Sequence, residues 1–230
     1  MGVRAVRLST VGQGSGAGRM QEQHADLRWN CSFQFRRPSS DLDISTPNEV
    51  YWARVNSYIE LAGRYGFTIL LNTWDTAGLT PLMESSGNTK MYNFGAFLGN
   101  RCKNLPNIIW MSGNYFQTWK TGATDNALIK NLMASIASED KNHLQTTELD
   151  HNRNKSLHDS VLEPYTSLDA VHDYYCTYSE VCSAYNAAAV PVFFEEGYFE
   201  NGTLVEYSRS ITCFRHSASC RPSQRVVDKC

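Results

Sequence analysis

Two segments that lie far apart in the chain end in polar residues that could do chemistry. Asn114 and Tyr115 follow the apolar run at residues 107–111, and Glu196 lies just past the apolar run at 190–194. In parallel α/β proteins the carboxyl ends of the strands open onto the ligand-binding face, so these side chains are expected to share one site. A carboxylate at the end of a buried strand, with an Asn at the end of another, indicates cleavage of glycosidic bonds.

The elements that must position these residues alternate between helix and strand. Thr46 is predicted to cap a helix whose first residue is Pro47, and Asp125 is predicted to cap a later one. Further helices are expected at 91–102, 127–138 and 179–188, and strands at 67–72, 107–111, 143–148, 168–172 and 191–195. The strands are mostly continuous apolar runs, which is typical of parallel strands buried on both faces. The pattern predicts an α/β fold with parallel strands at 67–72, 108–111, 144–148 and 192–195.

The two ends of the chain lack such a pattern. We expect an irregular N-terminal region at 1–40, one patterned domain at 41–206 and an irregular tail at 207–230. A formal net charge of -2 points to neither nucleic acid nor a membrane as a partner. No apolar run is long enough to cross a bilayer, and no signal peptide is visible. The seven cysteines include no CxxC pair and His151, His158 and His172 are scattered, so no metal site is expected.

Between residues 41 and 206 the sequence resembles the apiosidase-like family of TIM-barrel glycoside hydrolases, whose members are often labelled endoglucanases. The resemblance is carried by TPNEVYW at 46–52, LNTW at 71–74, LPNIIW at 105–110, SGN at 112–114, VFFEE at 192–196 and FE at 199–200. It implies a (β/α)8 barrel, a carbohydrate substrate of the plant polysaccharide or side-chain type, no cofactor, and a secreted or periplasmic location. The first two and the eighth barrel strands have no clear counterpart, so the barrel is expected to be incomplete.

The resemblance also implies a retaining mechanism with the nucleophile at the end of the seventh strand and the acid/base group after the fourth. It assigns the nucleophile to Glu196, although a solvated strand end is the simpler interpretation. Asn114 is expected to contact the 2-hydroxyl of the sugar, or else to cap a turn. Tyr115 occupies the acid/base position, where a phenol with a pKa near about 10 is a poor proton donor. Tyr115 could instead form an aromatic wall.

Five more residues near the predicted strand ends are expected to contact substrate. Glu148 and Asp75 could also supply the missing second carboxyl group, although structural roles are commoner for both. Three aromatic residues, Trp74, Trp119 and Tyr175, could stack on sugar rings or fill the core, as could the neighbouring Tyr174. The sequence therefore predicts a glycoside hydrolase impaired by Tyr115. The alternatives are a non-catalytic carbohydrate-binding remnant or a non-functional fragment of such an enzyme.

Overall fold

The described residues form two parallel β-sheets with helices packed around them. The computed structural model describes residues 4–9, 43–116, 123–151, 155–174 and 177–197. The larger sheet has the strand order β1 (Arg4–Ser9), β2 (Phe67–Asn72), β3 (Ile108–Met111) and β4 (Gln145–Thr146), and the smaller one pairs β5 (Asp169–His172) with β6 (Val192–Glu196). Within the described residues these sheets remain separate and do not close into a barrel. The predicted mixed α/β architecture is confirmed.

The strand register brings the carboxyl ends of neighbouring strands side by side. Asn72 of β2 lies opposite Met111 of β3, and Met111 lies opposite Thr146 of β4. In the smaller sheet His172 lies opposite Glu196, after a local irregularity in the register. All of these pairings are parallel, as the continuous apolar runs predict. The strand predicted at 143–148 is shorter, because only Gln145–Thr146 pairs as β4.

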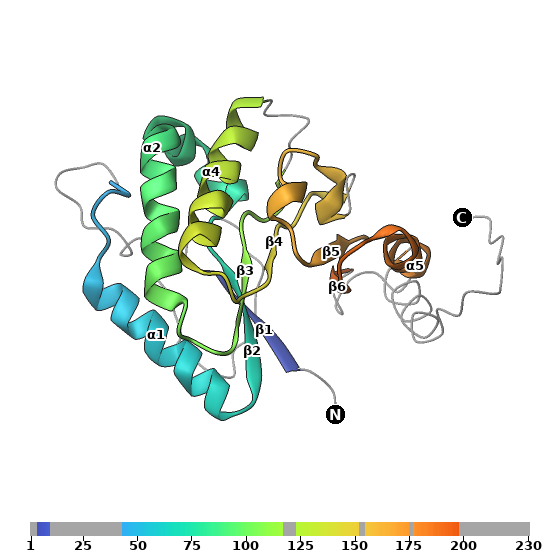
Figure 1. The fold of residues 1–230 in the computed structure, drawn as a ribbon, viewed down its shortest axis with the longest axis horizontal. Helices are drawn as coiled ribbons and strands as arrows, with labels where there is room; N and C mark the ends of the chain where they lie inside the picture. Colours follow the sequence, from blue (N-terminus) through green and yellow to red (C-terminus); the bar gives the residue numbers. More distant parts are fainter. Residues whose placement is uncertain (1–3, 10–42, 117–122, 152–154, 175–176, 198–230) are drawn as a thin grey trace.

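Three helices cover one side of the larger sheet, as Figure 1 shows. They are α1 (Glu49–Arg64), α2 (Thr76–Cys102) and α4 (Ala123–Glu139). On the other side lie β5, β6 and α5 (Thr177–Ala187), and two 3-10 helices, η3 (Ser156–His158) and η4 (Glu163–Tyr165), precede β5. No helix in the described part of the chain is both apolar and long enough to span a bilayer.

The helix boundaries differ from the prediction at three places. Asn48, not Thr46, caps α1, and its side-chain oxygen accepts hydrogen bonds from the main-chain nitrogens of Val50 (3.1 Å) and Tyr51 (3.4 Å). Asn and Thr are both good N-cap residues, so local sequence did not separate them. Asp125 lies inside α4, which begins at Ala123. Helix α2 begins well before residue 91 and is interrupted at Gly87, whose φ is 71°.

Strand β1 lies in the region that was expected to be irregular. Its sequence, RAVRLS, carries two arginines and contains no long apolar run. Among the described residues it pairs only with β2, which places it at the edge of this part of the sheet, where charged residues are tolerated. For Arg4–Ser9 the expectation of irregular structure is therefore wrong. The rest of region 1–40 and the tail at 207–230 lie outside the described residues.

One hydrophobic core joins α1, α2 and α4 to the larger sheet. Its largest fully buried side chains include Trp52, Phe94 and Trp110. Helices α2 and α4 approach closely at Gly95, where an added Cβ would lie 2.5 Å from the main-chain oxygen of Leu132. Only glycine permits this approach. The packed core therefore holds in place the strand ends that carry the polar residues.

Candidate active site

A β-bulge just past the ends of β3 and β4 positions Tyr115. The main-chain nitrogen of Glu148 donates to the oxygen of Gly113 (3.2 Å), and that of Phe116 donates to the oxygen of Glu148 (3.0 Å). In a regular parallel ladder the main-chain nitrogen of residue 115, and not that of Phe116, would donate to the oxygen of Glu148. The segment from Gly113 to Phe116 therefore contains one extra residue. Gly113 and Tyr115 have φ values of 94° and 51°. A left-handed conformation costs a residue such as Tyr about 1–2 kcal/mol, and here it directs Tyr115 towards two carboxyl groups.

Tyr115 is hydrogen-bonded to both of these carboxyl groups. Its hydroxyl donates to Oε1 of Glu196 at 2.6 Å, and its main-chain nitrogen donates to Oε1 of Glu148 at 3.3 Å. Glu196 is the last residue of β6, and Glu148 follows β4. One residue therefore links the ends of strands from the two sheets.

A second tyrosine contacts the same oxygen of Glu196. Tyr174, two residues after β5, donates its hydroxyl to Glu196 Oε1 at 2.9 Å and also contacts the Tyr115 hydroxyl. Burial raises the pKa of Tyr115, and its hydrogen bond to Glu196 raises it further. Burial likewise raises the pKa of Tyr174, as do its contacts with Tyr115 and Glu196. Both phenols therefore remain protonated near neutral pH and act as donors to Glu196.

Glu148 and His172 form the buried floor of the site. The Glu148 side chain is fully buried, and that of His172 is 1% exposed. Nδ1 of His172 lies 3.0 Å from the main-chain oxygen of Leu149 and 3.6 Å from Oε1 of Glu148. Burial lowers the pKa of His172, so the imidazole is neutral near pH 7 and donates from Nδ1 to Leu149. One ring nitrogen of His172 and one oxygen each of Glu148 and Glu196 lie within 4.8 Å of one another.

Asn114 lies on the same bulge as Tyr115. Its main-chain oxygen accepts a hydrogen bond from the hydroxyl of Thr76, at the start of α2. Its side-chain oxygen is buried and has no hydrogen-bond partner among the described residues. A buried amide oxygen of this kind is suited to accept a hydrogen bond from a ligand hydroxyl group.

The structure brings some of the predicted site residues together and places others elsewhere. Asn114, Tyr115, Glu148 and Glu196 gather as described above. Trp74 is fully buried and packs against Phe94, with ring centroids 6.0 Å apart. Of the two roles expected for Trp74, the structure supports packing in the core and not stacking on sugar, because its ring belongs to the hydrophobic core.

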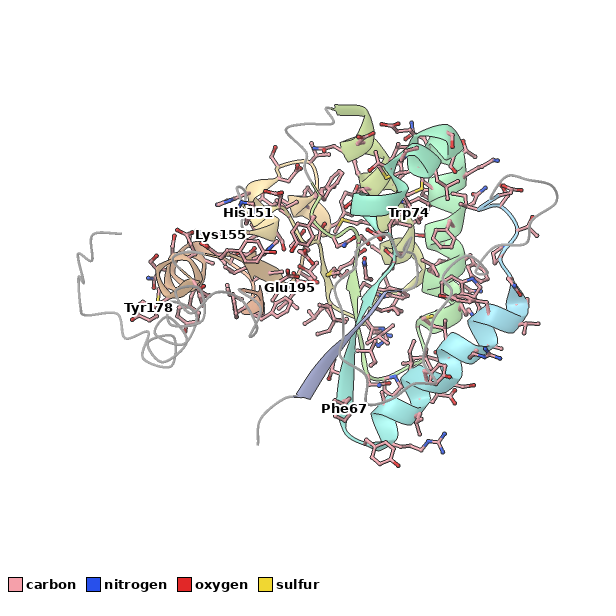
Figure 2. The ribbon with its side chains drawn as sticks, turned by 180° about the vertical axis from the view of Figure 1, so that it is seen from behind. Phe67, Trp74, His151, Lys155, Tyr178 and Glu195 are labelled. Carbon is pink, nitrogen blue, oxygen red and sulfur yellow. The ribbon has the colours of Figure 1, made fainter. Side chains whose placement is uncertain are left out.

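Three more residues were predicted to contact substrate, and none of them is among the site residues described above. Asp75 is partly buried in the turn before α2, where its main-chain oxygen accepts from the nitrogen of Leu79. Trp119 and Tyr175 lie outside the described residues. Figure 2 shows Trp74 on the side of α2 and α4, whereas Glu195 and His151 lie towards β5 and β6.

His172 was not predicted to belong to the site, and Tyr174 was expected only to stack on sugar or to fill the core. His172 is the last residue of β5, so the rule that places ligands at strand ends could have found it. The scattered histidine spacing gave no such signal, because His172 meets Glu148 and Glu196 only through the fold. Tyr174 lies beyond a predicted strand end, but its contact with Glu196 depends on a side-chain direction that sequence does not specify.

Solved structures of glycoside hydrolases share this fold. A glycoside hydrolase family 5 protein from Bacteroides vulgatus ATCC 8482 is 21% identical, with a TM-score of 0.55 over 66% of this chain and 35% of its own. Thermotoga maritima Cel5A, a mutant form in complex with cellobiose, is 15% identical, with a TM-score of 0.59 over 76% and 69%. The endo-1,4-beta-D-mannanase of Thermotoga petrophila RKU-1 is 12% identical, with a TM-score of 0.61 over 94% and 76%. Likeness at these identities shows the fold alone.

The sequence itself places the chain in a family. The apiosidase-like catalytic domain matches residues 19–220. The chain therefore belongs to the apiosidase-like catalytic-domain family, and the match extends beyond residues 41–206 at both ends. No curated protein matches the chain. The chain spans 35% to 45% of the length of the first three solved structures that it matches.

Proposed function

We propose that this protein hydrolyses glycosidic bonds with retention of configuration, using Glu196 and Glu148 as its two carboxyl groups. The observation that carries the proposal is their separation, because an oxygen of one lies within 4.8 Å of an oxygen of the other. Retaining glycosidases hold their carboxyl groups about 5–5.5 Å apart, whereas inverting enzymes need about 6.5–9.5 Å to admit a water molecule. The spacing supports the retaining mechanism.

Glu196 is the nucleophile in this proposal. It ends a strand, and two tyrosine hydroxyls donate to its Oε1, which fixes the direction of the carboxyl group. In the first step Glu196 forms a bond to the anomeric carbon while the bond to the leaving oxygen breaks. In the second step water displaces the glutamyl ester and restores the carboxylate.

Glu148 is the proton donor in this proposal. Tyr115 stands at the family's acid/base position, but its hydroxyl donates to Glu196 and its pKa is raised. Glu148 gives its proton to the leaving oxygen in the first step and takes one from water in the second. Because Glu148 is fully buried, the side chains that cover it must move when substrate enters. Asn114 accepts a hydrogen bond from a sugar hydroxyl.

The family and the structural neighbours support the proposed substrate class. The chain belongs to the apiosidase-like family, and its neighbours include a cellobiose complex and a mannanase. We infer that the described strands are part of a (β/α)8 barrel and that the substrate is a plant-type polysaccharide or its side chains. The carboxyl ends of barrel strands form the active site in such proteins.

A mechanism-based label tests the nucleophile. A 2-fluoro glycoside with a good leaving group should trap the glycosyl ester, because fluorine slows both steps and the leaving group rescues the first. Peptide mapping should find one label on Glu196, and Glu196→Gln should abolish it. The matched Glu195→Gln variant should still be labelled. A label on Glu195 or Glu148 would overturn the assignment of the nucleophile.

A non-catalytic carbohydrate-binding protein is the second candidate. Tyr115 favours it, because the family's proton-donor position carries no carboxyl group. Oligosaccharide binding in a calorimeter, without label and without release of reducing sugar, would support this candidate and overturn catalysis. A thermal melt without a cooperative transition would instead support a non-functional fragment.

A further inference from the structure

Three metal-ligating side chains meet at the floor of the site, and they come from the ends of three strands. They are Glu148 after β4, His172 at the end of β5 and Glu196 at the end of β6. Their ligand atoms lie within 4.8 Å of one another, and Glu148 and His172 are buried. We propose that Glu148, His172 and Glu196 bind a divalent transition-metal ion, for which Zn²⁺ is the probe. This inference does not depend on catalytic turnover.

The surroundings of His172 support the proposal independently of the cluster itself. Metal-binding histidines almost always donate their second ring nitrogen to a main-chain oxygen or a carboxylate, which fixes the tautomer and the ring direction. His172 has this arrangement, because Nδ1 lies 3.0 Å from the oxygen of Leu149. The ring atom left to bind a metal is Nε2, because Nδ1, which lies 3.6 Å from Oε1 of Glu148, is directed to Leu149. Nε2 is buried and has no hydrogen-bond partner among the described residues.

The two carboxyl groups are oriented in the same way by donors around them. Tyr115 and Tyr174 donate their hydroxyls to Oε1 of Glu196, and the main-chain nitrogen of Tyr115 donates to Oε1 of Glu148. Hydrogen bonds of this kind to ligating carboxylates usually accompany protein metal sites. Each of the three ligands is therefore held by at least one hydrogen bond to a neighbouring group.

The donor set selects the kind of ion. One imidazole nitrogen and two carboxylate oxygens suit Zn²⁺ and similar transition metals, whereas Ca²⁺ takes six to eight oxygens. Tetrahedral Zn²⁺ places neighbouring ligand atoms roughly 3.4 Å apart. The cluster must therefore contract by on the order of 1.5 Å at its widest, which rotation of the glutamate side chains can supply. Two carboxylates would neutralise the charge of the ion.

Glu196 belongs to both the proposed metal site and the proposed catalytic pair. A bound ion would occupy the carboxylate that must attack the sugar. Zinc and glycoside should therefore exclude each other, and zinc should inhibit any turnover reversibly. Failure of the label experiment on Glu196 would leave zinc binding unaffected, so the two proposals can fail separately.

Zinc binding to the full chain tests the inference. The metal-free protein is titrated with Zn²⁺ in competition with a chromophoric chelator, and Co²⁺ is added separately to record its visible spectrum. We expect the affinity to fall by at least about 100-fold in His172→Phe and in Glu148→Gln. The exposed His158 provides a matched control, because His158→Phe should bind as the parent does.

Three outcomes would overturn the proposal. The first is an unchanged affinity in a His172→Phe protein that still melts cooperatively. The second, if His172→Phe does not fold, is an unchanged affinity in Glu148→Gln, whose side chain keeps the shape of glutamate and can still accept from Tyr115. The third is a thiolate band in the Co²⁺ spectrum, which would assign the ion to cysteines.

Discussion

The Glu148→Gln substitution tests the proposed proton donor most directly. Glutamine has the shape of glutamate, and its oxygen can still accept the hydrogen bond from the main-chain nitrogen of Tyr115 (3.3 Å). The main-chain bonds of residue 148 to Gly113 and Phe116 are also unaffected. The variant should therefore fold like the parent but lack the proton that the leaving oxygen needs.

The size of the effect follows from the chemistry of the leaving group. General acid catalysis contributes about 10²–10⁴-fold to rate, or about 2.7–5.4 kcal/mol of barrier. Natural glycosides leave as poor alkoxides, so kcat/KM should fall by this factor in Glu148→Gln. Activated aryl glycosides leave without protonation, so their first step should slow less than about 10-fold.

The assay is kcat/KM over a series of aryl glycosides whose leaving groups become steadily poorer. Glu148→Gln should depend more steeply on leaving-group basicity than the parent, and azide should restore its second step by forming a glycosyl azide of retained configuration. Glu163→Gln, an exposed position, is the control and should match the parent. An equal loss over the whole series, or no loss in a folded variant, would refute the assignment of Glu148.

Three further predictions concern the same fold. Tyr115→Asp should change turnover of natural glycosides only a few-fold, because Glu148 already donates the proton; an increase of about 100-fold would assign that role to position 115. Asn48→Ala should lower the free energy of unfolding by about 0.5–2 kcal/mol in urea titrations, because α1 loses its N-cap, whereas Asn48→Asp should not. Burial opposes ionisation of Asp140, but hydrogen bonds from neighbours including the Trp110 indole lower its pKa from the usual 3.8. Ionised Asp140 therefore stabilises the fold above about pH 3.8. The parent should be more stable than Asp140→Asn at neutral pH, and this difference in unfolding free energy should shrink as the pH falls below 3.8.

The sequence predicted β2 and β3 with the limits that the structure shows, and it missed β1. Strand β2 has the predicted limits at Phe67–Asn72, and β3 has the predicted Ile108–Met111, because a continuous apolar run has few alternatives to a buried parallel strand. Strand β1 has a mixed composition, and its pairing with β2 is a contact between residues about 60 apart in the chain. A pattern within a short stretch of sequence does not reveal a contact between residues so far apart in the chain.

The site was predictable as a set of strand ends but not in its details. The rule that polar residues gather at the carboxyl ends of parallel strands correctly brought Tyr115 and Glu196 together. The hydrogen bond between them requires a bulge and a positive φ at Tyr115, and nothing in the spacing indicates either. His172 joins Glu148 only because two separate sheets meet, which depends on the whole fold.

The hydrogen bond from Tyr115 to Glu196 makes the protein's own phenol a competitor for any ligand of that carboxylate. Its hydroxyl already occupies Glu196 Oε1 at 2.6 Å. A hydrogen bond to a charged group contributes about 1.5–3 kcal/mol, so a sugar or ion that displaces it should bind about 10- to 150-fold more weakly than to an open carboxylate. The measured affinity of a ligand that displaces this hydrogen bond therefore reports the free energy of its contact with Glu196 less that of the contact between Tyr115 and Glu196. A ligand that leaves the phenol in place would escape this loss.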